Sequence, residues 1–126
     1  MRTWLFAAAV NGFIAVAAGA FAAHGLGGRL SPEALGWFET GARYQAYHAL
    51  ALLGVAALAE RAGSRTARLL TISGSCFSVG IAVFCGSLYL LALTGERWLG
   101  AVTPIGGVGF LAGWATIGLI SVTRRP

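Results

Sequence analysis

Residues 69–93 read LLTISGSCFSVGIAVFCGSLYLLAL, a run of about 25 residues without one charged side chain. An α-helix rises about 1.5 Å per residue and the hydrocarbon core of a bilayer is about 30 Å thick, so about 20 apolar residues are enough to cross it. A helix of this length can cross with some tilt. The stretch therefore predicts a transmembrane helix.

Three further apolar stretches lie on either side, at about residues 4–23, 44–60 and 103–122. Hydrophobic residues make up 57% of the chain and charged residues 10%, whereas soluble domains have about 25% charged residues. In lipid, such stretches need no protein cover if each helix bonds its own backbone groups. We therefore predict an all-α fold, a bundle of four transmembrane helices forming a single integral membrane domain over residues 1–126.

The segment between the first two stretches predicts one additional short helix. Glycines at 25, 27 and 28 end the first span, because glycine tolerates the left-handed backbone of a helix end. Ser31 then suits an N-cap, Pro32 the first helical turn, and Glu33 the positive end of the helix dipole. We expect residues 32–41 to form an amphipathic helix at the membrane interface, which joins the second span through a bend at its last residue.

The basic residues predict an orientation. All nine are arginines, and six fall on one side of a four-span topology (Arg2, Arg61, Arg65, Arg68, Arg124 and Arg125) against three on the other (Arg29, Arg43 and Arg97). By the positive-inside rule, this bias puts both termini and the 60–68 loop in the cytoplasm. Since the arginines lie between spans rather than along one face, the net charge of +5 does not indicate nucleic-acid binding.

Small and polar residues within the spans predict helix packing. Small residues recur every four positions on the third span, at Gly74, Ser78, Ala82 and Gly86, and Gly109 with Gly113 forms a G-x-x-x-G pair on the fourth. Both patterns let helix backbones approach closely in lipid. Asn11 predicts an interhelical hydrogen bond, and the indole N–H of Trp114, placed in mid-span, needs a partner.

Several segments resemble one family. The stretch GAFAAHGL at residues 19–26 resembles the GAFGAHGL signature of the family called domain of unknown function 423, which includes the eukaryotic transmembrane protein 256. The segments LSPE at 30–33, FETGARYQAYHAL at 38–50 and TPIGG at 103–107 agree as well, as does Gly113 with Trp114. Ala22 stands where the family usually has Gly. The resemblance implies a four-span protein of the bacterial inner membrane and implies no reaction.

Polar residues near the start of the second span form a candidate ligand-binding cluster: His24, Arg43, Tyr44, Gln45, Tyr47 and His48. We expect it at the outer membrane surface, with Tyr89 nearby. Three interpretations are open. In the first, the residues hold the helices together through polar contacts. In the second, Arg43 binds the carboxylate or phosphate of a head group through two parallel N–H donors. In the third, His24 and His48 form a metal or haem site.

The sequence favours a non-enzymatic membrane module, either an accessory subunit or a protein that binds lipid or a small ligand. A small-molecule transporter or channel-like protein is the alternative, and a bis-histidine haem protein is a further one. We expect no catalytic residues, no cofactor and no metal. The expected partners are the lipid bilayer and other membrane subunits or a second copy of the chain.

Overall fold

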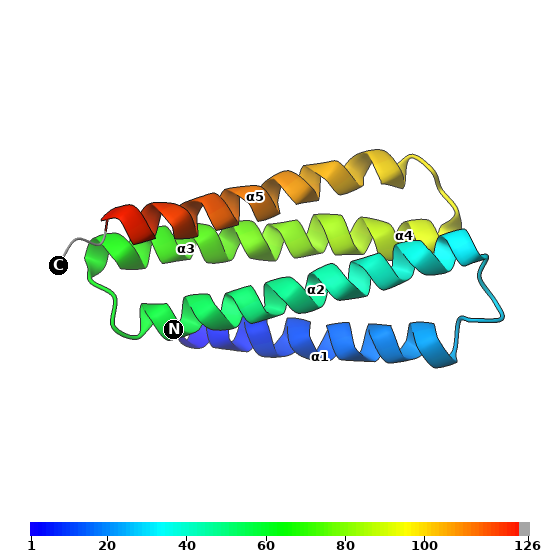
Figure 1. The fold of residues 1–126 in the computed structure, drawn as a ribbon, viewed down its shortest axis with the longest axis horizontal. Helices are drawn as coiled ribbons and strands as arrows, with labels where there is room; N and C mark the ends of the chain where they lie inside the picture. The colour runs from blue at the N-terminus through cyan, green and yellow to red at the C-terminus, as the bar shows by residue number, and fades with distance from the viewer. Residues whose placement is uncertain (124–126) are drawn as a thin grey trace.

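The computed structural model describes residues 1–123, and every regular element in that range is a helix. The elements are α1 (Arg2–His24), α2 (Pro32–Ala59), α3 (Ser64–Gly80), a five-residue π-helix η1 (Ile81–Cys85), α4 (Gly86–Thr94) and α5 (Leu99–Thr123). Because α3, η1 and α4 follow one another without a break, they form one rod (Figure 1). Arg124 and Arg125, which contribute to the predicted charge bias, lie outside the described residues.

The four rods lie side by side, each antiparallel to the next in sequence (Figure 1). The α1–α2 and α4–α5 connections lie at one end of the molecule, which we call the 25–31 end. The start of α1, the α2–α3 turn and the end of α5 lie at the other, the 60–63 end. α1 packs mainly on α2, and α5 packs mainly on the α3–η1–α4 rod, so α2 and that rod occupy the centre.

Three of the rods are long and apolar enough to cross a membrane: α1, the continuous run Ser64–Thr94, and α5. These agree with three of the predicted spans. α2 is not among them, because the polar run from Arg43 to His48 lies in its middle.

The separate interfacial helix is not present. Residues 32–41 are the beginning of α2, which continues without interruption for 28 residues, about 42 Å at the usual rise. Ser31 is the N-cap as expected, since its hydroxyl accepts from the N–H of Ala34 at 3.1 Å. The helix continues through Gly41 without a break. A Cβ there would lie 2.8 Å from the ring of Tyr89, so this glycine makes room for a neighbouring helix instead.

The first turns of α2 pack against α1 and α4. Phe38 is buried in a cluster with Ala22, Leu26, Ala34 and Ala92. Its ring lies 6.2 Å from that of Phe21 and 4.8 Å from that of Tyr89. The apolar face that suggested a helix on the membrane surface therefore packs against α1 and α4.

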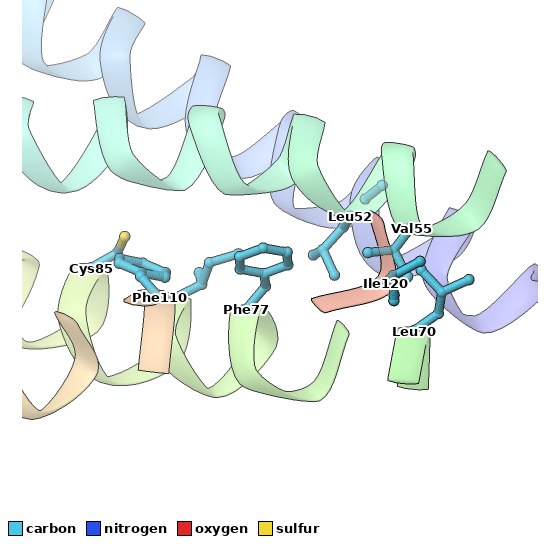
Figure 2. Close-up of a cluster of buried hydrophobic side chains, with 9 residues drawn as sticks. Leu52, Val55, Leu70, Phe77, Cys85, Phe110 and Ile120 are labelled. Atoms are coloured by element: carbon cyan, nitrogen blue, oxygen red, sulfur yellow. The ribbon is translucent and has the colours of Figure 1, made fainter. Parts of the chain in front are cut away.

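The main core fills the space between α2, the α3–η1–α4 rod and α5 (Figure 2). Leu52, Leu70 and Phe77 are fully buried within it, and Figure 2 shows them in one row along the bundle with Val55, Cys85, Phe110 and Ile120. Such contacts are dispersion and packing contacts, which hold helices together where lipid removes the hydrophobic driving force between them.

α5 approaches η1 closely through glycine. A Cβ on Gly106 would lie 2.7 Å from the Cα of Phe84, and one on Gly109 would lie 3.2 Å from the Cα of Gly80. The expected pair of Gly109 and Gly113 lies in this interface, where Gly113 faces the ring of Phe77. The small residues on the third span do not all allow close contact. A Cβ on Gly74 would lie 2.7 Å from the ring of Trp4, whereas a Cβ on Gly86 would meet nothing within 4 Å.

Gly106→Ala should lower the stability of the protein in detergent by about 2 kcal/mol, because the new methyl group meets backbone atoms of η1 that cannot move aside. Gly107→Ala is the matched control, since its Cβ would meet only the Phe84 ring at 3.9 Å. Thermal unfolding followed by circular dichroism measures both. Equal midpoints for the two variants would show that the helices do not approach as closely as described.

Candidate functional site

His48 is the most constrained polar residue of the bundle. Its side chain is 4% exposed. Nδ1 lies 2.8 Å from the carbonyl oxygen of Tyr44, one turn earlier on α2, and Nε2 lies 3.1 Å from the indole Nε1 of Trp114 on α5. A carbonyl only accepts and an indole only donates. The imidazole is therefore neutral, with its proton on Nδ1, and both nitrogens are engaged.

Aromatic rings hold this imidazole in place. It stacks on Phe110 with a centroid distance of 3.6 Å and an interplanar angle of 7°. Phe77 lies 5.6 Å from it and 5.1 Å from the ring of Trp114. With its plane and both nitrogens fixed, His48 ties α2 to α5 across the α3–η1 rod.

A groove of about 610 Å³ opens beside His48. Its lining comes from α2, η1 and α5: Tyr44, Tyr47, His48, Phe84, Pro104, Gly107, Val108, Phe110, Leu111 and Trp114. On α5 the lining runs from Pro104 to Trp114, which corresponds to about 15 Å along the helix. The volume lies within the usual range of about 300–1,000 Å³ for small-molecule pockets.

The polar atoms that remain available in the groove are the tyrosine hydroxyls. Tyr44 is 37% exposed and Tyr47 52% exposed, and their rings pack edge to face at 5.7 Å. Within residues 1–123 neither hydroxyl makes a hydrogen bond, in contrast to that of Tyr89. The groove thus combines an apolar lining with two free phenol groups on its α2 wall.

Gln45 belongs to a different polar chain. The hydroxyl of Tyr89 donates to Gln45 Oε1 at 2.7 Å, and Gln45 Nε2 donates to Asn11 Oδ1 at 3.0 Å. Asn11 Nδ2 in turn donates to the carbonyl of Ala7. This chain contains the interhelical hydrogen bond expected for Asn11, and it joins α1, α2 and α4 beside a smaller hollow of about 420 Å³.

The structure divides the predicted cluster. Tyr44, Tyr47 and His48 share the groove, Gln45 lies in the other polar chain, and Arg43 is exposed on α2 next to the groove. His48 lies opposite Trp114, near the middle of α5, and not at the outer end of the bundle as predicted.

His24 is exposed and distant from His48. Phe21, three residues before His24 on α1, packs against Phe38, and Phe38 lies about 15 Å from His48 along α2. Because α1 runs antiparallel to α2, His24 is farther away still. This separation and the engaged nitrogens of His48 do not suit two axial ligands of one iron. Within residues 1–123 no group of three or more His, Cys, Asp or Glu side chains could hold a metal ion.

The predicted cluster contains three of the ten groove residues and misses the other seven, among them the aromatic residues Phe84, Phe110 and Trp114. A signal for Trp114 was present, since a mid-span indole N–H needs an acceptor and a mid-span imidazole nitrogen can supply one. For the two phenylalanines there was none, because their ring positions depend on how closely α5 approaches η1.

Comparison with known proteins identifies the family. Residues 18–107 match the model described as "Protein of unknown function (DUF423)". The chain belongs to this family. It is 44% identical to the UPF0382 inner membrane protein YgdD of Escherichia coli K12, with 98% of this chain and 94% of YgdD covered. It is 40% identical to the UPF0382 membrane protein YwdK of Bacillus subtilis 168, with 97% and 98% covered.

A third relative, a UPF0382 membrane protein of Haemophilus influenzae, is 46% identical, with 90% of this chain and 89% of that protein covered. No solved structure matches the chain significantly. The family predicted from the sequence segments is confirmed, and with the three apolar rods it identifies the chain as a small membrane protein.

Removing the partner of His48 should destabilise the bundle. Trp114→Phe keeps a ring in place but leaves Nε2 of the buried imidazole without a donor, which costs about 1–3 kcal/mol. In a double-mutant cycle of His48→Ala and Trp114→Phe, we expect a coupling of about 1 kcal/mol or more in thermal unfolding in detergent.

The matched control is a cycle of His48→Ala with Trp98→Phe, because Trp98 is exposed outside the helices. Those two effects should add. Additive effects for the first pair as well would contradict the hydrogen bond as an energetic tie between α2 and α5.

Proposed function

We propose that all four rods cross the membrane. α1 and the α3–η1–α4 rod each have the length and apolar character of a span. α2 connects the end of α1 at the 25–31 end to the start of α3 at the 60–63 end (Figure 1). A connection between opposite ends of two spans has to cross the bilayer itself, and its polar groups are tolerated because they face the bundle interior or a groove.

The arginines support one orientation. Arg2, Arg61, Arg65 and Arg68 lie at the 60–63 end, whereas three arginines lie on the half of the molecule nearer the 25–31 end. The positive-inside rule then favours a cytoplasmic 60–63 end and an outward-facing 25–31 end. In a bacterial inner membrane, both termini would be cytoplasmic.

Cysteine labelling tests this orientation. In a Cys76→Ala, Cys85→Ala background, Gly28→Cys should react with a membrane-impermeant maleimide on intact spheroplasts, and Gly63→Cys only after permeabilisation. Both glycines have open space around a new side chain, so accessibility and not folding decides the result. The opposite labelling pattern would reverse the orientation.

We propose that the protein is a non-enzymatic, bilayer-embedded module that binds the apolar part of an amphiphile in the groove between α2 and α5. The observation that carries this proposal is the groove itself, which is largely apolar and has three half-exposed amphipathic rings, Tyr44, Tyr47 and Trp114. Pockets of this character, with a few polar groups on an apolar wall, are typical ligand sites.

The rigidity of the groove supports binding over stitching alone. The wall that contains Trp114 is fixed by the hydrogen bond to His48 and the stacking on Phe110. A wall that is ordered before binding costs less entropy when a ligand arrives. Stitching accounts for the bonds that His48 makes, but it gives the hydroxyls of Tyr44 and Tyr47 no role.

The state of His48 supports a non-enzymatic role. A general base needs a free nitrogen within hydrogen-bond reach of the proton that it removes. Nδ1 of His48 donates to a carbonyl, and Nε2 accepts from Trp114. His24, the other histidine, is the last residue of α1 and does not line the groove, so neither imidazole offers a base to a bound molecule.

Filling the groove should abolish retention of lipid. Gly107→Leu places an isobutyl group in the groove lining, where a Cβ meets only ordinary contacts. Gly118→Leu adds the same group to an open position of α5 and is the matched control. Native mass spectrometry from detergent should show one phospholipid retained by the unsubstituted protein and by Gly118→Leu, and none by Gly107→Leu. Equal retention by all three would contradict binding in this groove.

A further inference from the structure

Arg43 lies beside the groove at an unusual depth. It is exposed on α2, directly before Tyr44 and one turn before Tyr47, which both line the groove. Its Cα lies about 17 Å along α2 from Pro32, well inside a helix that crosses the bilayer. An uncompensated charge at such a depth is costly, and arginines there are usually paired or reach toward the interface.

The helix geometry gives the direction of that reach. Side chains on an α-helix lean toward its N-terminus, and the N-terminus of α2 lies at the 25–31 end (Figure 1). By this rule the side chain of Arg43 leans toward the leaflet at that end, beside Tyr44, which lines the groove. The groove continues from there to Trp114 in mid-bundle.

The length of the groove fits one leaflet. The lining from Pro104 to Trp114 spans about 15 Å, which is half of a hydrocarbon core of about 30 Å. An acyl chain that enters from the 25–31 end would reach from the head-group side to the membrane midplane. Its head group would then lie at the level to which Arg43 extends.

From this geometry we propose that the groove holds one acyl chain of an anionic phospholipid from the leaflet at the 25–31 end, with the guanidinium of Arg43 binding its phosphate. The proposal rests on the proposed binding function of the groove and names the class of ligand. Arginine matches a phosphate with two parallel N–H donors. The hydroxyl of Tyr47, one turn further along α2, can donate to the ester oxygens.

Glu39 is the other charged group on this part of α2. It is exposed one turn toward the 25–31 end, a spacing that allows a helical ion pair with Arg43. A bidentate pair with one carboxylate engages two of the five guanidinium N–H donors. Arg43 therefore keeps donors for a phosphate, and Glu39 acts as a competitor whose removal should favour the anionic lipid.

Fluorescence quenching by brominated lipids tests the proposal. In a background of Trp4→Phe, Trp37→Phe and Trp98→Phe, Trp114 is the single reporter inside the groove. The protein is reconstituted in phosphatidylcholine vesicles, and phosphatidylglycerol or phosphatidylcholine brominated on one acyl chain is titrated in. We expect half-quenching at a roughly tenfold lower mole fraction of the brominated phosphatidylglycerol, the factor that one charge-assisted pair supplies.

Three variants separate Arg43 from general electrostatics. Arg43→Gln should remove the preference for phosphatidylglycerol over phosphatidylcholine. Arg97→Gln, at an exposed arginine of the same end of the molecule, should retain the preference. Glu39→Gln should retain or increase it. An equal loss of preference in Arg43→Gln and Arg97→Gln would overturn the proposal. The total positive charge at the 25–31 end would then account for the lipid preference without a specific contact of Arg43.

The remaining outcomes are also distinct. Equal quenching of the unsubstituted background by both lipids would contradict the preference for an anionic head group, but it would not contradict lipid binding in the groove. Quenching that Gly107→Leu does not reduce, for either lipid, would sink the groove function itself. A change of oligomeric mass in Arg43→Gln, measured by light scattering in detergent, would assign Arg43 to contact with a second copy and overturn its role in lipid binding.

Discussion

If α2 crosses the bilayer as proposed, no water reaches its buried polar groups, so each of these buried groups has to find its partner within the protein. This constraint explains the organisation of the bundle better than apolar packing does. His48 is satisfied by its own helix and by Trp114 of α5, and Gln45 by Asn11 of α1 and Tyr89 of α4. The two polar residues lie less than one turn apart, and between them they determine the neighbours of α2 on both sides.

Glycine determines how closely the remaining helices can approach. Gly106 lets the backbone of α5 lie against η1 at Phe84, and this approach brings Phe110 under the imidazole of His48. The next residue, Gly107, lines the groove, and a Cβ there would meet only the ring of Phe84 at 3.9 Å. The two adjacent glycines thus have different effects. Gly106 permits the close contact with η1, and Gly107 leaves room for the groove beside it. η1 lies at this contact, in keeping with the tendency of π-turns to mark functional sites.

Much of this arrangement could be predicted from local sequence signals. The apolar lengths predicted three of the rods, Ser31 predicted the start of α2, and Asn11 predicted a hydrogen bond between helices. The errors have a common cause, because each concerned how far α2 extends. Its amphipathic first turns suggested a helix on the membrane surface, whereas its apolar face is covered by Phe21 of α1 and Tyr89 of α4. The periodicity of a segment shows that one face is apolar. It does not show whether lipid or a neighbouring helix covers that face.

The same unforeseen length of α2 changes the meaning of the polar run. With a short second span, residues 43–48 would lie at the membrane surface, where water satisfies polar groups at little cost. On a helix of about 42 Å that crosses the bilayer as proposed, His48 would lie at mid-depth and only Arg43 would still reach the interface. In that arrangement the polar residues would differ in role according to depth. The deepest, His48, has both ring nitrogens bonded, the tyrosines above it are half-exposed with free hydroxyls, and the arginine would extend toward the head groups. The polarity of the groove would then increase from its apolar end near Trp114 to the charged Arg43. An amphiphile has the same increase in polarity, from its acyl chain to its head group, and is therefore complementary to such a groove.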